Sequence, residues 1–206
     1  MGQQDEDMPS MRSSDGSATR SVRSDAKRNT DALLEAAMEV FATRGVDAPV
    51  REIAQKAGVG IGTVYRHFPQ RADLIAAVFR REVDACADAA AALSASYGPA
   101  DALAAWLLRY TDFIAAKRGL APALHSGDPA YVSLHSYFKE KLLPVLRGLL
   151  DAAIEAGEVR DDIESMELLS AVANLCISAG KADGAVARRM VSLVVDGLRY
   201  GATDKS

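Results

Sequence analysis

The chain is poor in cysteine and lacks long apolar runs, and each shortage excludes a class of protein. Its two cysteines, Cys86 and Cys176, lie far apart, with no Cys-x-x-Cys pair and no histidine at ligand spacing. This excludes a disulfide framework and a zinc site, and we expect both thiols to be small buried side chains. No stretch approaches the roughly 18 consecutive apolar residues of a membrane span, and the start of the chain is polar and acidic rather than a signal peptide. We therefore expect a cytoplasmic protein that does not enter a membrane.

Strand signals and catalytic motifs are also missing from the sequence. Alternating runs of Val, Ile and Thr are absent, and no Asn-Gly or Asp-Gly turn joins two such runs. There is no phosphate-binding glycine loop, no GxSxG, no HExxH and no carboxylate–histidine cluster with ligand spacing. His125 and His135 are separated by Gly127 and Pro129 and are not expected to hold a metal. We expect an all-α protein that is not an enzyme, with no catalytic residues, metal site or cofactor.

What the chain does contain is enough apolar sequence for a sizeable core. Of its 206 residues, 49% are hydrophobic and 25% are charged, the balance of a soluble globular protein. The net charge of −4 does not indicate a polyanionic partner. The charge is uneven, however: residues 12–71 hold ten Lys/Arg and seven Asp/Glu, whereas residues 76–206 hold fourteen and seventeen. This mild asymmetry permits nucleic-acid binding by the first third of the chain.

The first 25 residues are polar and almost free of large apolar side chains. We expect residues 1–25 to be a disordered basic and polar arm. It is either a solvated tail or an arm that lies along DNA. The basic residues within it and just after it are Arg12, Arg20, Arg23, Lys27 and Arg28.

Three helices are expected next, with breaks at glycine and proline. The first covers residues 30–44, begins at a cap supplied by Asn29 or Thr30, and ends at Gly45. Pro49 occupies a first-turn position of the second helix, which ends at Gly58. The third helix covers residues 63–68. The apolar stripe of the first helix consists of Leu33, Leu34, Ala37, Met38 and Phe41.

The rest of the chain also has helical periodicity, which gives about nine helices in all. A long helix follows from about residue 72 and ends before Gly98. Further helices are expected over residues 101–117, 120–125, 129–156, 164–179 and 182–199. Pro144 lies inside one of them, where a kink is expected, and Gly180 separates the last two.

The second and third helices have the spacing of a helix-turn-helix. Ala54 is small enough to let the two helices approach, and Gly58 can adopt the left-handed conformation that the turn needs. Ile53, Val59 and Val64 are expected to point inward. The third helix is then presented outward, in the way that a recognition helix enters a major groove.

At these residues the chain resembles the TetR family of transcriptional repressors. The match is GVGIGTVYRHFPQRADLI over residues 58–75, preceded by VREIAQKA. The stretch AWLLRYTDFIAAKRGLAPAL, residues 105–124, resembles the C-terminal domain of SbtR-like members. The resemblance implies a DNA-binding domain over residues 26–72 and a helical ligand-binding and dimerisation domain over residues 73–206.

The resemblance also implies roles for the recognition helix on double-stranded DNA. Phosphate contacts fall on Thr63, Tyr65, His67 and Arg71. Gly62 lets the backbone approach DNA closely, and Arg66 is the candidate for a guanine base edge. Gly60 and Ile61 stand where relatives often have polar side chains, although Ile61 can touch a thymine methyl. Phe68, in contrast, is expected to pack inside.

TetR-like proteins are homodimers that bind a palindromic operator, and a small molecule entering the C-terminal domain weakens that binding. Candidate seam residues, which would equally suit an intramolecular core, are Leu168, Leu169, Val172, Leu175, Val191, Val194, Val195 and Leu198. Candidate pocket residues, which could also be core, are Trp106, Tyr110, Phe113, His125, Tyr131, His135, Phe138 and Asn174. The effector itself is unknown.

Three functions therefore stay open at the level of the sequence. The first is a repressor that a small-molecule effector releases from its operator. The second is a constitutive or activating helix-turn-helix regulator without a small ligand, which the sequence does not separate from the first. The third is an all-helical enzyme or ligand-binding protein that only contains a helical hairpin, and the missing catalytic motifs speak against the enzyme.

Overall fold

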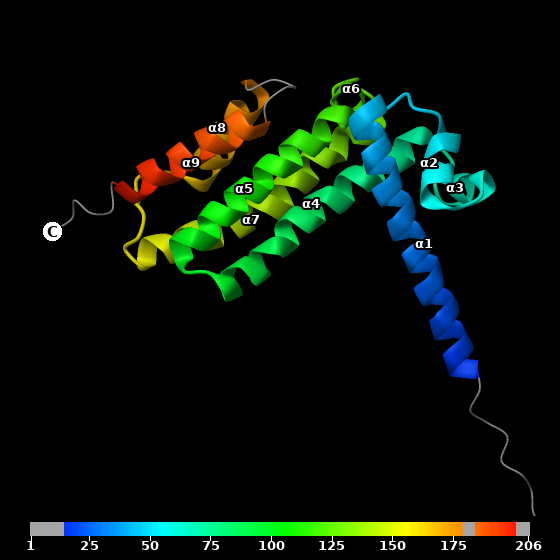
Figure 1. The fold of residues 1–206 in the computed structure, drawn as a ribbon, viewed down its shortest axis with the longest axis horizontal. Helices are drawn as coiled ribbons and strands as arrows, with labels where there is room; N and C mark the ends of the chain where they lie inside the picture. The colour runs from blue at the N-terminus through cyan, green and yellow to red at the C-terminus, as the bar shows by residue number, and fades with distance from the viewer. Residues whose placement is uncertain (1–14, 179–183, 201–206) are drawn as a thin grey trace, which may run out of the picture.

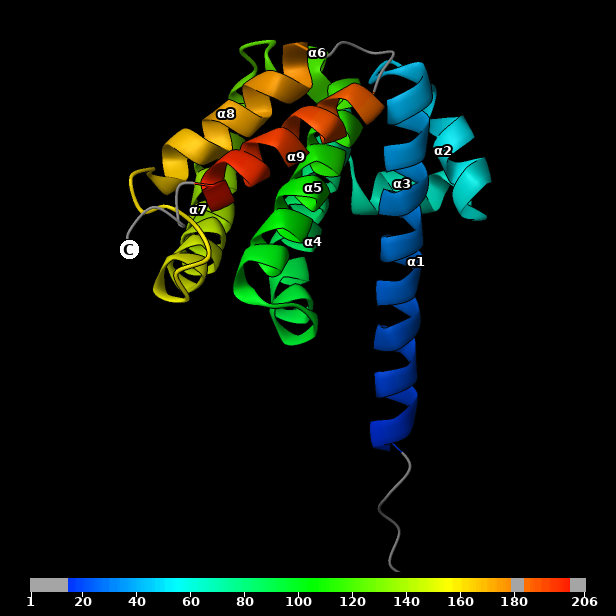
Figure 2. The ribbon, with the colours of Figure 1, turned by 60° about the vertical axis from the view of Figure 1, so that its left-hand side comes forward.

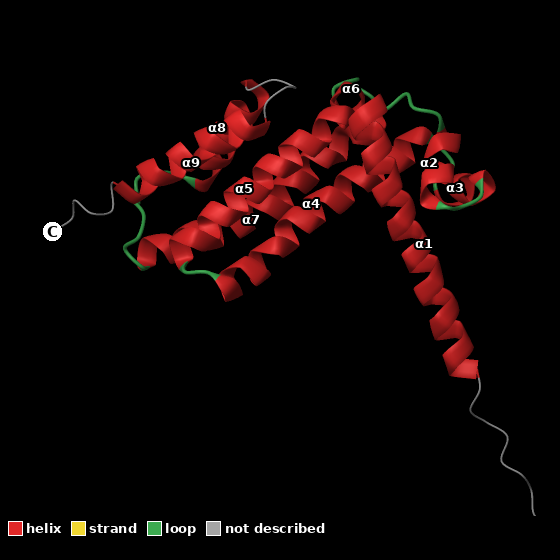
Figure 3. Ribbon diagram, in the orientation of Figure 1, coloured by secondary structure: helices red, strands yellow, loops and turns green. Residues whose placement is uncertain are grey.

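The computed structural model describes residues 15–178 and 184–200, and in these residues it contains helices and no strand (Figure 3). The all-α prediction is confirmed. In chain order the elements are α1 (Asp15–Arg44), α2 (Val50–Ala57), α3 (Ile61–His67), α4 (Arg71–Ser96), α5 (Pro99–Lys117), the 3-10 turn η1 (Arg118–Leu120), α6 (Ala121–Leu124), the 3-10 turn η2 (Pro129–Tyr131), α7 (Val132–Glu155), α8 (Ser165–Ser178) and α9 (Gly184–Tyr200).

The helices form a long bundle with a smaller group at one end (Figure 1). α4, α5 and α7 pack on one another along their lengths, and α8 and α9 lie together over α5 and α7 (Figures 1 and 2). α2 and α3 lie beside the C-terminal half of α1, whose N-terminal half projects away from the body. No helix in the described ranges is both long and apolar enough to cross a membrane.

α1 is longer than the sequence predicts. Residues 1–14 lie outside the described part of the chain, but helix begins at Asp15, so the prediction of disorder is wrong for residues 15–25. Between Ser17 and Arg44 there is neither proline nor glycine to interrupt a helix. Asn29 and Thr30 are therefore interior residues rather than caps. The apolar stripe is confirmed, because all five of its side chains are buried.

The helix ends agree with the expected breaks. Gly45 ends α1 with a φ of 81°, and Gly157 follows α7 with a φ of 70°. Pro49 lies one residue outside the predicted first turn, as the extended N-cap of α2. Two of the expected helices are each divided into a 3-10 turn and an α-helix. The helix expected over residues 120–125 corresponds to η1 and α6, and the helix expected over residues 129–156 corresponds to η2 and α7. The expected break at Gly180 lies outside the described residues.

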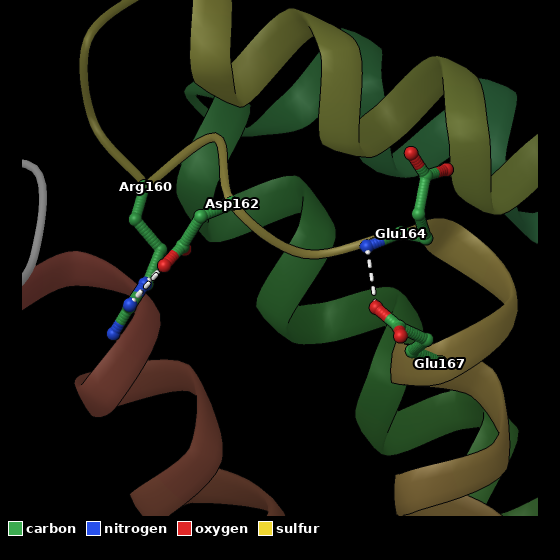
Figure 4. Close-up of polar contacts among 4 residues, drawn as sticks. All are labelled: Arg160, Asp162, Glu164 and Glu167. Carbon is green, nitrogen blue, oxygen red and sulfur yellow. Dashed lines mark hydrogen bonds and ion pairs between the residues drawn. The ribbon is translucent and has the colours of Figure 1, made fainter.

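The connection between α7 and α8 is tied down at both ends. Figure 4 shows the side chain of Arg160 paired with Asp162, and the backbone N–H of Glu164 donating to the Glu167 carboxylate at 3.1 Å, which caps the start of α8. The backbone N–H of Arg160 donates to the carbonyl of Leu198 near the end of α9 at 2.9 Å. The connection thereby holds α8 and α9 in register.

The candidate seam residues belong mostly to the core of one chain. Leu175 and Val194 are half-buried. The other six, buried against α5 and α7, are Leu168, Leu169, Val172, Val191, Val195 and Leu198. The sequence left seam and core open for these residues, and burial within a single chain favours the core for these six. Cys86 and Cys176 are buried free thiols, as expected.

Candidate DNA interface and internal pocket

The turn between α2 and α3 has the geometry of a helix-turn-helix. Gly58 ends α2 in the left-handed region with a φ of 68°. The N–H of the next residue, Val59, donates to the carbonyl of Ala54 at 3.0 Å, which closes the turn. Ile53, Ala54 and Val64 are buried and hold the two helices together. The predicted inward positions of Ile53 and Val64 and the role of Gly58 are confirmed, whereas Val59 is half-buried against the core.

The outward face of α3 consists largely of side chains that are exposed to solvent. Tyr65 is 52% exposed and Ile61 is 45% exposed, which is high for large apolar groups. Arg66 and His67 are exposed, and Thr63 is half-buried. Within the described residues, the side chains of Tyr65 and Arg66 form no hydrogen bond and no ion pair. This face is therefore available to a partner outside the chain.

Arg71, the first residue of α4, turns its guanidinium toward the protein instead. One nitrogen donates to the carbonyl of Ala48 at 2.8 Å, and the other donates to the carbonyl of Val46. Both acceptors lie in the loop between α1 and α2. The side chain thus fastens the start of α4 to the helix-turn-helix. Sequence reasoning missed this role, because a backbone carbonyl leaves no signal in the sequence.

A pocket of about 400 Å³ opens beside the far end of the bundle from the α4–α5 turn. Its walls come from α4, α5, α6, η2, α7 and α8. The lining residues are Phe79, Tyr110, Lys117, Ala121, Leu124, His125, Tyr131, Leu134, His135, Phe138, Lys139, Met166, Leu169, Ser170 and Ala173. The volume lies near the lower end of the range, roughly 300–1,000 Å³, that is usual for small-molecule sites.

The structure brings five of the candidate pocket residues together and corrects three. The five that line the pocket are Tyr110, His125, Tyr131, His135 and Phe138. Trp106 is a core residue, with its indole N–H donating to the carbonyl of Cys86 at 2.9 Å. Phe113 is fully buried behind Phe138, and Asn174 is exposed on α8. Helical spacing indicates that an aromatic residue points inward, but not whether it reaches a cavity.

The 3-10 turn η1 joins this pocket to two other parts of the chain. Lys117, just before η1, lines the pocket. The guanidinium of Arg118 donates to the carbonyl of Cys176 in α8. Gly119 lies against the backbone of α1, and Leu120 is buried in the core. A displacement at Lys117 would therefore be felt in both α1 and α8.

Comparison with known proteins finds two family matches along the chain. Residues 33–78 match the family described as bacterial regulatory proteins of the tetR family, and residues 98–200 match the C-terminal domain of SbtR-like transcriptional regulators. The chain belongs to the TetR family of transcriptional regulators. The first match covers α2 and α3, and the second covers most of the pocket.

Solved structures of TetR-family proteins share the fold over most of their length. A TetR transcriptional regulator from Streptomyces coelicolor is 41% identical, with 82% of this chain and 97% of that one covered and a TM-score of 0.72. A TetR regulatory protein from Mycobacterium vanbaalenii is 37% identical, with 86% and 99% covered and a TM-score of 0.68. An HTH-type transcriptional regulator from Staphylococcus aureus is 39% identical over 64 residues. That last match covers 31% of this chain and only 35% of the relative.

Proposed function

We propose that this TetR-family regulator is a homodimeric repressor that binds a palindromic operator and is released from it by a small-molecule effector. The observation that supports DNA binding is the outward face of α3, where exposed side chains without partners stand on a helix anchored by the buried Val64. An exposed tyrosine and an exposed arginine on a recognition helix are suited to phosphate and base contacts respectively.

The individual roles follow from where each side chain lies. Tyr65 and His67, both exposed, are placed to bind phosphate oxygens, and Thr63 at the edge of the same face can add a third contact. Arg66 is the candidate for reading a guanine, and Ile61 for touching a thymine methyl. A Cβ at Gly60 or Gly62 would meet no other atom within 4 Å, so these positions leave open room on the DNA side. Arg71 acts mainly by positioning, although its remaining N–H groups can face a phosphate.

We place the dimer seam on the outer faces of α8 and α9. Ile177 is 65% exposed and Leu193 is 60% exposed, although both are large apolar side chains. Exposed apolar groups on adjacent helices favour a protein interface. A twofold contact there would set the distance between the two α3 helices, and this distance selects the half-site spacing of the operator.

Release by an effector is proposed from the position of the pocket. η1 contacts α1, and η2 contacts the first part of α4, so the pocket walls are continuous with both helices that hold α2 and α3. A ligand that fits only one arrangement of these walls would favour that arrangement. If the favoured arrangement holds the two α3 helices of the dimer at a distance that does not match the half-site spacing, the ligand lowers the affinity for the operator.

Footprinting of the DNA next to the protein's own gene tests the proposal. We expect protection of a twofold-symmetric site, and sedimentation at micromolar concentration should give a dimer. Replacing Ile177 and Leu193 by glutamate should yield a folded monomer that no longer protects the site. The matched control is Tyr97→Glu, because Tyr97 follows α4 and its side chain is 54% exposed. This substitution should change neither the oligomeric state nor the protection of the site. A monomeric wild-type protein, or the absence of any sequence preference, would contradict the proposal.

A further inference from the structure

The lining of the pocket is one-sided in charge. Four of its residues have basic side chains, namely Lys117, His125, His135 and Lys139, and none has a carboxylate. The remaining lining is apolar or aromatic, apart from the hydroxyls of Tyr110, Tyr131 and Ser170. A cavity of this kind offers an uncharged or cationic ligand no ionic partner, whereas it offers an anion several.

Lys117 is the basic group that lies deepest. It is the last residue of α5, and its Nζ lies 5.6 Å from the ring centroid of Phe113 and 5.3 Å from that of Phe138. Burial lowers the pKa of this ammonium from its ordinary value of 10.5. Within the described residues, Lys117 forms no ion pair with a carboxylate. Lys139, His125 and His135, in contrast, are exposed at the rim, where water solvates them.

A half-buried ammonium without a carboxylate is costly. Removing it from water carries a penalty that two aromatic faces offset only in part. An anion brought to Nζ would supply the missing partner, and in a partly dehydrated site such a charge-assisted hydrogen bond is stronger than one in water. In the free pocket, the positive charge on Nζ of Lys117 therefore lacks an anionic partner.

The aromatic wall beside Lys117 defines the other half of the ligand. The rings of Tyr110, Phe113 and Phe138 form a continuous series, with centroids 6.0 to 6.2 Å apart. Phe79 extends this series from α4, at 6.1 Å from Phe113. Leu134 and Leu169 complete an apolar lining next to the charged end. The arrangement fits an amphipathic molecule with a charged head and a short apolar or aromatic body.

We propose that the pocket binds a small organic carboxylate, with its carboxylate group on Nζ of Lys117 and its apolar or aromatic body against Tyr110, Phe79 and Leu169. This inference rests on the proposed function, in which the pocket is the effector site, and it names the chemical class of the effector. The volume of about 400 Å³ is sufficient for a body the size of a single ring or a medium-length alkyl chain. Lys117, the least exposed of the basic side chains in the lining, fixes the position of the anion.

Calorimetry and thermal unfolding of the full chain test the proposal, with phenylacetate and octanoate as probes. Each probe is compared with its primary amide, which has nearly the same shape and no charge. We expect at least one carboxylate to bind and stabilise the protein, and its amide to bind about tenfold more weakly or worse. Lys117→Met keeps an apolar stem and should abolish the preference for the acid. Lys139→Met is the matched control and should retain it.

The possible outcomes separate this inference from the proposed function. If both amides bind as well as the acids, or if Lys117→Met keeps the preference, or if no probe binds, the inference is overturned. The comparison of acid with amide uses the wild-type chain, so it holds even if the Lys117 variant does not fold. Operator binding is measured on the same samples. A carboxylate that binds through Lys117 and leaves operator affinity unchanged supports the inference and contradicts the effector role.

Discussion

Gly119 lies so close to the backbone of Phe41 that no side chain fits between them. A Cβ at Gly119 would lie 2.6 Å from the carbonyl carbon of Phe41 and 2.9 Å from the Cα of the next residue, Ala42. Backbone atoms cannot move aside as a flexible side chain can. At this contact η1 meets the C-terminal part of α1, and glycine is what allows it.

Gly119→Ala should therefore push η1 away from α1. We expect a loss of roughly 1–3 kcal/mol in the free energy of unfolding, since overpacking at a rigid contact costs about that much. Denaturant titration measures it. The control is Gly148→Ala in α7, where a Cβ would meet nothing within 4 Å and the expected effect is a gain of roughly 0.5–1 kcal/mol. Equal effects of the two substitutions would show that the contact with Phe41 is not tight.

The glycines of the helix-turn-helix should separate folding from DNA binding. Gly58→Ala places a Cβ at a positive φ and should lower stability by about 1–2 kcal/mol. Gly62→Ala lies inside α3 in open space and should raise stability by roughly 0.5–1 kcal/mol, yet weaken operator binding because the added methyl faces DNA. Thermal unfolding and fluorescence anisotropy on one operator measure both effects. Unchanged operator affinity of Gly62→Ala would contradict the close approach proposed for this face.

Tyr65 and Arg66 are adjacent and both exposed, but they should fail differently when removed. Tyr65→Ala should weaken binding to all DNA sequences alike, because a phosphate contact contains no sequence information. Arg66→Ala should relax specificity at one base pair, at a cost of about 1–3 kcal/mol for the preferred site. Binding to a set of operators with single base-pair changes measures the difference. An Arg66→Ala protein that loses affinity uniformly would refute base reading by this residue.

Substitutions of Arg71 should distinguish a structural role of this side chain from a phosphate contact. Its two hydrogen bonds to the loop carbonyls predict that Arg71→Met lowers the free energy of unfolding by roughly 1.5–3 kcal/mol, the range for bonds that involve a charged group. Arg71→Lys keeps the charge but not the two-pronged geometry, so it should restore little of this stability. If Arg71 served only as a phosphate ligand, Arg71→Met would leave stability unchanged and reduce the salt dependence of DNA binding by about one ion.

Lys117 should make stability depend on alkaline pH. Because burial lowers its pKa in the folded state, the folded protein releases this proton before the unfolded chain does. Its penalty is complete below the folded-state pKa and disappears as the pH rises toward 10.5, the ordinary value. Lys117→Met should therefore be more stable than the wild type near neutral pH, and the difference should shrink as the pH rises.

Other titrating groups near the pocket do not mimic this trend. Burial raises the pKa values of Tyr110 and Cys176 above their ordinary values, and because both groups are present in the wild type and in the variant, they cancel from the difference. Lys139 is likewise present in both proteins and cancels from their difference. Lys139→Met provides the direct control, because it removes an exposed ammonium of the same pocket rather than the half-buried one. A stability difference for Lys117→Met that does not change with pH would mean that its ammonium is fully hydrated.

Local signals made the helix-turn-helix predictable, whereas the pocket depends on contacts between distant segments. Gly58 and Val64 act within a few residues of each other, so their spacing is visible in the sequence. Phe79, Lys117 and Met166 meet only after the bundle has formed, and nothing in their local sequence indicates it. Trp106 shows the opposite case. The sequence made it a candidate for the pocket, but its side chain is fully buried in the core.

The contacts around η1 also restrict the number of residues between Lys117 and Leu120. A 3-10 turn has about three residues per turn, so successive side chains are separated by roughly 120° and face in different directions. One extra residue between Lys117 and Leu120 would rotate every later contact by a third of a turn. The core position of Leu120 and the contact of Gly119 with α1 would then be lost together. Most surface connections tolerate insertions, but among homologues this segment should keep its length.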